Sequence, residues 1–450
     1  MRTTARPSCL AALGVQGHGA RPGRAPVVTG VLVALVAAPE GAREWVLVVR
    51  CSRVRSPRSA RSVPPHYDRW NTLEGGGPQR GVPVDARERV RRALRGEPTD
   101  RPPVAYLFLG GARHVLGRMG DRMASAYRDA DGIAQAQMVA AEMFGHDAGM
   151  VPWGCLTVEA EAFGCRLEWH EDYYPRVVER PLETTQDLSV LPEPDPAWSG
   201  RMPLMLGALT RLRERAGDDL FIVAMVVSPF LVAAELRVMT ELLADFVVDP
   251  SFVDALFDRV TEGTGRYLRA IVGTGACDAV MFENAGACRE MMGPHHLERF
   301  VMPCERRLLE AARREAPEVF LIEHNCSATP YFEEILTLDV DAVSFAYGDV
   351  RGIAERYGWD CRTAHTSANA CLDRFCLRPR DAGRPIAWIG NVDNSRIMLE
   401  AAPAQVEREA RACIESARGS AFVLSTSCEI PFKAPPENIE ALARAARAGF

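Results

Sequence analysis

The residues of this chain with the clearest chemical potential are a histidine and a cysteine two positions apart, with a second cysteine far downstream. They are His324 and Cys326, separated by Asn325, and Cys428. A catalytic Zn²⁺ commonly takes three protein ligands from His, Cys and carboxylates, and its fourth position stays open for water or substrate. The pattern therefore predicts a zinc site formed by His324, Cys326 and Cys428.

A competing interpretation is that these cysteines are ordinary core residues, because free Cys is among the most buried residue types. The chain contains 13 Cys, so one Cys near one His is not specific by itself. The flanking sequence favours a metal, since each ligand group follows an apolar run typical of a buried strand, residues 319–322 and 421–424. Residues two apart on a strand point to the same side, so His324 and Cys326 face one ion while Asn325 points away.

Apolar runs of strand length alternate with helical patterns from Asp85 onward. Asp85 and Glu88 have the spacing of a capping box at the start of a helix, and Gly96 is placed to end it. Further helices are expected at residues 133–144, 204–215, 233–246, 250–272, 294–312, 403–417 and 436–447. Strands are expected at residues 104–109, 148–151, 220–227, 279–282, 319–322, 342–345, 386–389 and 421–424.

This alternation implies right-handed βαβ units and a parallel sheet. About eight such units predict an α/β fold, a (β/α)₈ TIM barrel with an N-terminal extension. In that fold the C-terminal ends of the strands form the active site. The three zinc ligands lie at such ends, as do Asn284, Asn391 and Asp393.

The first 84 residues differ from the rest in composition. Residues 1–84 carry twelve Arg and four acidic residues, a balance of +8 in a chain of net charge −6, so residues 85–450 carry −14. An acidic body is a poor partner for nucleic acid. The apolar stretch at 27–38 lies too far from the start for a signal peptide, so residues 1–84 are predicted to be a disordered extension or a misassigned start.

The remaining composition excludes several classes of protein. No run of eighteen apolar residues occurs, so no transmembrane helix is expected. Thirteen irregularly spaced Cys predict reduced thiols and a cytoplasmic protein. Lys433 is the only lysine, which excludes a Walker P-loop and leaves Schiff-base chemistry a single candidate residue.

Several segments resemble proteins of the uroporphyrinogen decarboxylase superfamily. Residues 85–104, from Asp-Ala-Arg-Glu-Arg-Val to Asp-Arg-Pro-Pro-Val, are similar to the opening of those proteins. The segment Thr157-Val-Glu-Ala-Glu-Ala-Phe-Gly-Cys165 resembles the branch of corrinoid- and coenzyme M-type methyltransferases. The match continues through Ser228-Pro-Phe, Gly390-Asn-Val-Asp393, Ser427-Cys-Glu-Ile-Pro and Pro435-Pro-Glu-Asn438, and so spans about residues 85–450.

The resemblance implies a (β/α)₈ barrel with a zinc site of the His-x-Cys plus distant Cys type, matched by His324, Cys326 and Cys428. The implied reaction moves a methyl group between a methylcobamide and a thiol whose pKa is lowered by zinc. The thiolate is the nucleophile. No Asp-x-His-x-x-Gly corrinoid-binding stretch occurs, so the corrinoid is expected on a partner protein or free in solution. The other partner is a small thiol or methylated small molecule, with no nucleic acid and no membrane.

Four polar residues in the matching segments are candidates for further roles. Glu159 and Glu161 are two apart, so on an extended stretch they would face one way. Either one is a candidate for a fourth zinc ligand that is displaced when the thiol binds. Either one could equally help to bind the cobamide. The alternative is that both are solvated carboxylates in a loop. Asn391 and Asp393 are candidates for lining the pocket, although turn chemistry accounts for Asn-Val-Asp-Asn equally well.

Two other functions stay open at this point. Uroporphyrinogen decarboxylases, which act in tetrapyrrole biosynthesis, resemble one another in an Arg-Gln-Ala-Gly-Arg-Tyr segment after the first strand. Here that region contains Arg113 and Arg118 without the motif, which favours the methyltransferase. A non-catalytic corrinoid- or thiol-binding barrel is the other alternative, since a fold does not determine function. Lys433 and the segment 362–384 depart from the family pattern, and both are expected to border the opening of the active site. The sequence therefore does not specify the methyl donor and acceptor.

Overall fold

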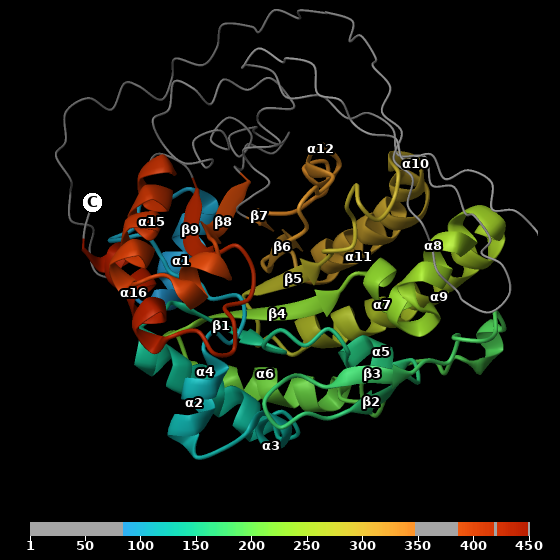
Figure 1. Cartoon of the computed structure of the whole chain (residues 1–450), viewed down its shortest axis with the longest axis horizontal. Coiled ribbons are helices and arrows are strands. Elements are labelled where there is room, and N and C mark those ends of the chain that lie inside the picture. The colour runs from blue at the N-terminus through green and yellow to red at the C-terminus, as the bar shows by residue number, and fades with distance from the viewer. Residues whose placement is uncertain (1–83, 347–385, 418–420, 449–450) are drawn as a thin grey trace, which may run out of the picture. The chain divides into compact units, whose positions relative to one another are not determined.

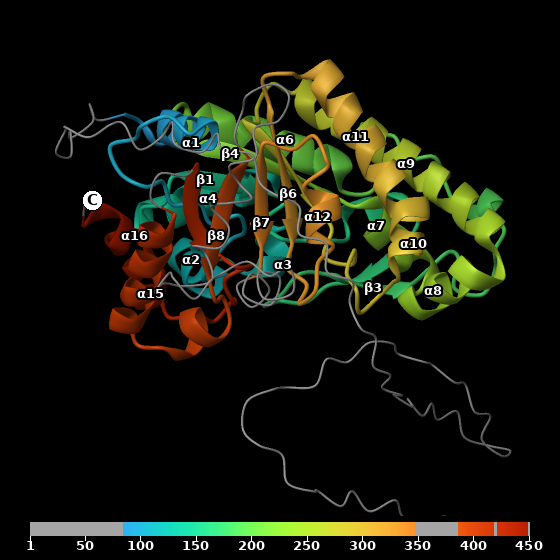
Figure 2. The same cartoon turned by 90° about the horizontal axis from the view of Figure 1, so that it is seen from above.

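The computed structural model describes residues 84–346, 386–417 and 421–448, in which parallel strands form a central barrel and helices surround it (Figure 1). The view from above shows the strands running side by side between the helices (Figure 2). The expected segment 362–384 and the extension 1–83 lie outside the described residues. No described helix is long and apolar enough to cross a membrane.

Seven strands form a parallel sheet in the order β1-β4-β5-β6-β7-β8-β9. They are β1 (Ala148–Val151), β4 (Phe221–Val227), β5 (Ala279–Glu283), β6 (Phe320–Asn325), β7 (Ala342–Phe345), β8 (Ala387–Val392) and β9 (Phe422–Thr426). Val104 pairs in parallel with Leu424 of β9, and Ala105 pairs with Ala148 of β1. These two residues connect the edges of the sheet, so the predicted (β/α)₈ barrel is confirmed.

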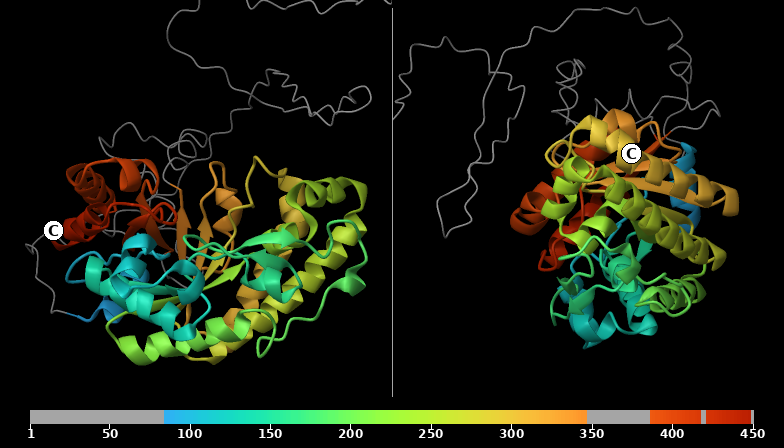
Figure 3. Two further views of the ribbon diagram at one scale, coloured as in Figure 1. Left: turned by 60° about the horizontal axis from the view of Figure 1, so that its bottom comes forward. Right: turned by 90° about the vertical axis from the view of Figure 1, so that its right-hand side faces the viewer.

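Long helices follow most of the strands and pack outside them (Figure 3). They are α1 (Ala86–Arg95), α2 (Ala112–Met119), α4 (Ala130–Phe144), α6 (Met202–Ala216), α7 (Pro229–Arg237), α8 (Met239–Val248), α9 (Pro250–Gly273), α11 (Met302–Glu315), α15 (Pro403–Ser416) and α16 (Pro436–Arg447). Shorter pieces are α3 (Met123–Ala126), α5 (Val158–Ala162), α10 (Pro294–His296), η2 (Leu297–Val301), α12 (Phe332–Ile335) and the hairpin β2 (Arg166–Glu168) and β3 (Arg176–Glu179).

The first helix begins and ends as its sequence predicts. The Asp85 side chain accepts a hydrogen bond from the Glu88 N–H at 2.7 Å, and Gly96 ends the helix at φ 71°. The helix packs against β1, β4, β8 and β9. Its capping therefore determines where the chain enters the barrel.

Three aspartates lie one residue before β1, β5 and β7 and hold neighbouring strands together. The side chains of Asp147, Asp278 and Asp341 accept from backbone N–H groups of the preceding strand in the barrel, at 2.8, 2.9 and 2.8 Å. Each carboxylate also pairs with arginine, Asp147 with Arg89 and Arg101 at 2.7 Å. Buried carboxylates need such compensation because removing a charge from water is expensive.

Two expected elements differ from the structure. The strand expected at 104–109 pairs only through its first two residues, because the chain then turns with Gly110 N–H bonded to Phe108 at 2.9 Å. A Cβ at Gly110 would lie 2.7 Å from Ile430, so only glycine passes there without displacement. The helix expected at 233–246 breaks into α7 and α8 at Val238, whose φ is 75°.

Removal of the Asp147 carboxylate tests how far the fold depends on these clamps. Asp147→Ala removes the carboxylate shared by Arg89, Arg101 and the Val104 N–H, and only Arg89 keeps a second carboxylate, Asp100, so we expect the free energy of unfolding to fall by about 3–5 kcal/mol. The exposed Asp218, which pairs with Arg87 at the surface, is the control. Asp218→Ala should leave the free energy of unfolding nearly unchanged, because exposed ion pairs contribute little. Urea unfolding followed by circular dichroism measures the free energy of unfolding of both variants. An equal loss in the two variants would show that Asp147 does not stabilise the barrel more than a surface carboxylate does.

Candidate metal centre

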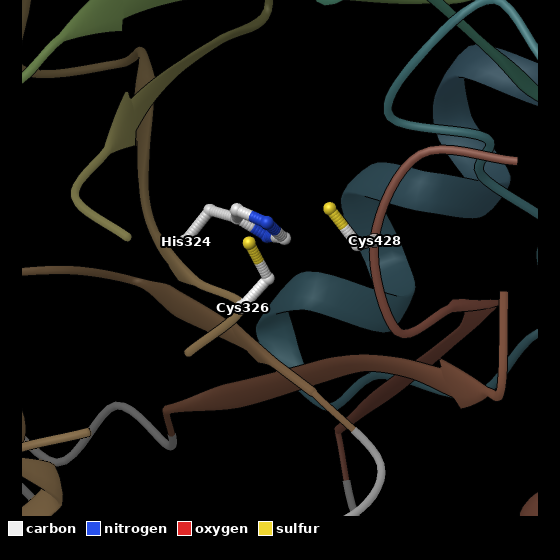
Figure 4. A group of neighbouring side chains, drawn as sticks. All are labelled: His324, Cys326 and Cys428. Carbon is white, nitrogen blue, oxygen red and sulfur yellow. The ribbon is translucent and has the colours of Figure 1, made fainter. Parts of the chain in front are cut away.

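The structure brings together the three residues predicted as metal ligands. One ligand atom from each of His324, Cys326 and Cys428 lies within 4.8 Å of the other two. His324 belongs to β6 and Cys326 follows its last residue, whereas Cys428 lies in the turn after β9. Figure 4 shows the imidazole and both thiols pointing toward one another. The structure therefore places these three side chains together, and their role as metal ligands stays a prediction.

Asn325 points away from this cluster, as the alternation of a strand predicts. Its Nδ2 donates hydrogen bonds to the backbone oxygens of Asn284 at 2.8 Å and Ala287 at 3.0 Å. These bonds connect the end of β6 to the segment that follows β5. The residue between the two ligands thus positions the loop beside the site.

Strand register places two further side chains on either side of the histidine. Glu283 of β5 pairs with His324 of β6, and His324 pairs with Ser344 of β7. The Ser344 Oγ lies 3.0 Å from His324 Nδ1, and the Glu283 Oε2 lies 3.6 Å from His324 Nε2. His324 is fully buried, and its Nε2 has no hydrogen-bond partner.

This donor set fits a zinc ion. A fully buried imidazole nitrogen without a partner is expensive unless something binds it. With Nδ1 occupied by Ser344, the unpartnered Nε2 is the nitrogen left for a metal, and the two sulfurs are ligands that Zn²⁺ prefers. Among the described residues this is the one group of three or more His, Cys, Asp or Glu side chains with ligand atoms close enough for an ion.

The two thiols share their charge unequally. A hydrogen bond from Cys428, together with the neighbouring His324, lowers the pKa of Cys326 to about 4. The same hydrogen bond, with burial, raises the pKa of Cys428 well above its usual value. One sulfur is therefore held as a thiolate, which is the form that ligates a metal.

Buried charges also shift the histidine and its neighbouring carboxyl. Burial lowers the pKa of His324, but Glu283 and Cys326 outweigh it and raise the pKa to about 8. Burial raises the pKa of Glu283 to about 7, although the nearby His324 opposes this. Both pKa shifts arise because ionisable groups of opposite charge are buried side by side.

Besides Glu283 and Ser344, three further residues that the sequence did not indicate lie near the cluster. The Phe108 ring stands edge-on to the His324 ring, with centroids 5.5 Å apart. The Tyr174 hydroxyl donates to the Glu429 Oε1 at 2.6 Å. Burial raises the pKa of Glu429 to about 7. The one available signal was position, since Glu429 is the residue after the ligand Cys428.

The expected arrangement of Glu159 and Glu161 is wrong, because both lie in the short helix α5 and not on an extended stretch. Residues two apart on a helix diverge. Glu159 is buried and its Oε1 accepts from the Val227 N–H at 2.9 Å, while Glu161 pairs with Arg201 at 2.5 Å. Their roles toward a metal or cobamide stay predictions.

The candidates at the end of β8 have local partners. Asp393 accepts from the backbone N–H groups of Ser395 and Arg396 at 3.0 and 2.7 Å, which is the turn chemistry considered above. Asn391 is fully buried, with Nδ2 3.5 Å from the Phe345 oxygen and Oδ1 without a partner. Whether either one touches a substrate stays a prediction.

Comparison with known proteins gives one family. The sequence profile described as "Uroporphyrinogen decarboxylase (URO-D)" matches residues 85–449. A methylcobamide:CoM methyltransferase MtbA of Methanosarcina mazei is 23% identical over 363 residues, covering 80% of this chain and 97% of that protein. A uroporphyrinogen decarboxylase of Psychromonas ingrahamii is 23% identical over 366 residues, covering 78% and 94%.

A solved structure described as a methyltransferase from Methanosarcina mazei has the same fold. Its TM-score is 0.68 at 23% identity, and the alignment covers 81% of this chain and 99% of that one. This likeness supports the barrel assignment made from the strand order.

Glu159 provides a test of the buried charges around the barrel. Burial raises its pKa to about 7, above the ordinary value of 4.5. The folded state therefore favours the neutral acid, and this contribution to stability is full below pH 4.5 and lost as the pH rises through 7. Glu159→Gln keeps an Oε1 acceptor for Val227 but cannot ionise.

We expect wild type to lose about 2–3 kcal/mol more unfolding free energy than Glu159→Gln between pH 5 and pH 8. Urea unfolding at the two pH values measures the difference. Glu142→Gln, at a side chain that is 68% exposed, is the control and should follow wild type. Parallel pH curves for wild type and Glu159→Gln would show that Glu159 does not titrate as described.

Proposed function

This chain belongs to the uroporphyrinogen decarboxylase (URO-D) family, and from that membership we propose that it is a zinc-dependent methyltransferase acting between a methylcobamide and a thiol. The observation that supports the proposal is the convergence of His324, Cys326 and Cys428 at the C-terminal ends of the barrel strands. Relatives named as methylcobamide:CoM methyltransferases are similar over four fifths of the chain. Methyl transfer from a methylcob(III)amide needs a thiolate as the acceptor, and a zinc ion held by these residues would keep a substrate thiol in that form.

The residues would hold the metal through His324 Nε2 and the two sulfurs. Zinc bound there supplies a Lewis acid that lowers the pKa of a substrate thiol, so that the thiolate is available near neutral pH. Ser344 lies 3.0 Å from Nδ1 and so leaves Nε2 as the nitrogen that would bind the metal. Glu283, with Oε2 3.6 Å from Nε2, is a carboxylate within reach of the fourth position.

The proposed transfer forms one bond and breaks another. The thiolate sulfur attacks the methyl carbon, the sulfur–carbon bond forms, and the cobalt–carbon bond breaks. The electron pair of that bond stays on cobalt, which leaves as cob(I)amide, and the thiol proton passes to solvent. The barrel side chains orient the sulfur and exclude water, and Phe108 covers one edge of the imidazole. We further propose that the corrinoid arrives on a partner protein or free in solution.

Zinc content is the first measurement that tests this proposal. We expect wild type purified under reducing conditions to hold about one zinc per chain by mass spectrometry, and both His324→Ala and Cys428→Ala to lose it. Cys165→Ala is the matched control, because this buried thiol lies outside the cluster and contacts the backbone of Glu235. Zinc-loaded wild type should then demethylate methylcobalamin in the presence of a thiol, seen as a change in its visible absorbance.

A reduced wild type without zinc would contradict the proposal. It would return the three residues to ordinary core chemistry. An assay of uroporphyrinogen decarboxylation without oxygen would then become the next step, since proteins of that name are also among the relatives.

The serine beside the histidine gives a second test of the same site. Ser344→Ala removes the partner of Nδ1 and frees the ring and its tautomer, so we expect zinc affinity to fall roughly 10–100-fold. Competition with a coloured chelator measures the dissociation constant without any activity assay. Ser344→Thr keeps the hydroxyl and should retain most of the affinity. Equal affinities for wild type and Ser344→Ala would show that Ser344 does not orient the ligand.

A further inference from the structure

A glutamate next to the metal ligand Cys428 has one carboxylate oxygen without a hydrogen-bond partner in the described structure. Glu429 Oε1 accepts from the Tyr174 hydroxyl at 2.6 Å, and no described residue donates to Oε2. The Asn394 side chain binds the Glu429 backbone oxygen at 2.7 Å and holds the turn in place. The carboxylate is therefore fixed in position, with half of its acceptor capacity unused.

Contacts around Gly154 place this carboxylate on the same side as the metal ligands. A Cβ on Gly154 would lie 2.9 Å from Phe108, 3.0 Å from the Tyr174 hydroxyl and 3.2 Å from Glu429 Oε2. The ring of that same Phe108 stands edge-on to the His324 ring. Glycine at this position leaves Oε2 uncrowded, and a chain of contacts connects it to the ligand cluster.

Two glutamates near the three candidate ligands lack an arginine partner. In the part of the chain that the structure describes, neither Glu283 nor Glu429 forms an ion pair with Arg or Lys. Asp147 and Asp278, before strands β1 and β5, have two and three arginine partners. Two thiolates already balance the charge of a Zn²⁺ ion, so an ionised Glu283 or Glu429 has no offsetting charge among the described residues.

We propose that the thiol acceptor carries an ammonium group and that Glu429 binds it through Oε2. This inference rests on the proposed methyl transfer and specifies the substrate class of the same site. An ammonium group supplies the missing countercharge and three donors, and it needs no movement of Tyr174. A sulfonate or carboxylate tail would meet two carboxylates instead, and such unpaired like charges reject a substrate.

Three two-carbon thiols that differ in the charge of the tail test this proposal. Cysteamine has an ammonium tail, 2-mercaptoethanol a neutral hydroxyl and 2-mercaptoethanesulfonate an anion. With zinc-loaded full-length protein and methylcobalamin, we expect kcat/KM for cysteamine to exceed that for the sulfonate by roughly tenfold or more. In Glu429→Gln that ratio should fall to within about threefold, while 2-mercaptoethanol changes little.

The ratios of kcat/KM are compared between wild type and the variants, so that differences in the intrinsic reactivity of the three thiols cancel. Glu437→Gln is the matched control, because it removes the same charge from an exposed side chain at the start of α16. It should keep the wild-type order of thiols. Zinc content is measured for both variants, so that a lost metal does not imitate a changed preference.

Calorimetric binding of the three thiols to zinc-loaded protein separates this inference from the proposed function. If cysteamine binds best in a Glu429-dependent way but no thiol is methylated, the inference stands and the methyl transfer fails. A preference for the sulfonate, or a thiol order that Glu429→Gln leaves unchanged, would overturn the inference. Failure of all three thiols to bind would overturn it as well.

Discussion

The closure of the barrel through two residues is the constraint on which the rest of the structure depends. A seven-stranded parallel sheet has two open edges, and unpaired edge groups are a liability. Val104 and Ala105 pair with these edges, and Asp147 accepts the Val104 N–H while it pairs with arginine. Closure brings the end of β9 around to the end of β6, so Cys428 reaches His324 although more than a hundred residues separate them.

Buried carboxylates at the two ends of the barrel have different partners. At the N-terminal ends of the strands, Asp147 and Asp278 meet arginines and backbone N–H groups, so their charges stabilise the strand pairing. At the C-terminal ends, Glu283 and Glu429 have no arginine partner among the residues described. Unsatisfied polar groups tend to be retained where function requires them. This contrast supports the proposal that the C-terminal ends of the strands bind the substrates while the N-terminal ends stabilise the fold.

Much of the fold was predictable because it depends on local signals. The cap at Asp85 and the bounds of α16 follow from capping residues and helical periodicity. The proximity of His324, Cys326 and Cys428 was also predictable, since each of the two groups follows an apolar run typical of a buried strand. Glu283 and Ser344 were not, because both enter the site through the register of neighbouring parallel strands. The helix at Glu159 was missed because five residues are too few to show a period.

The geometry of the candidate site also depends on the register between neighbouring strands. Side chains alternate along a strand, so a slip of one residue between β6 and β7 would turn Ser344 to the opposite face. Nδ1 of His324 would then lose its partner, and the imidazole would no longer present a defined nitrogen to the thiols. A metal bound by these residues, as proposed, would add its binding free energy only to the folded state with the correct register. It would thus select the same strand alignment that creates its site.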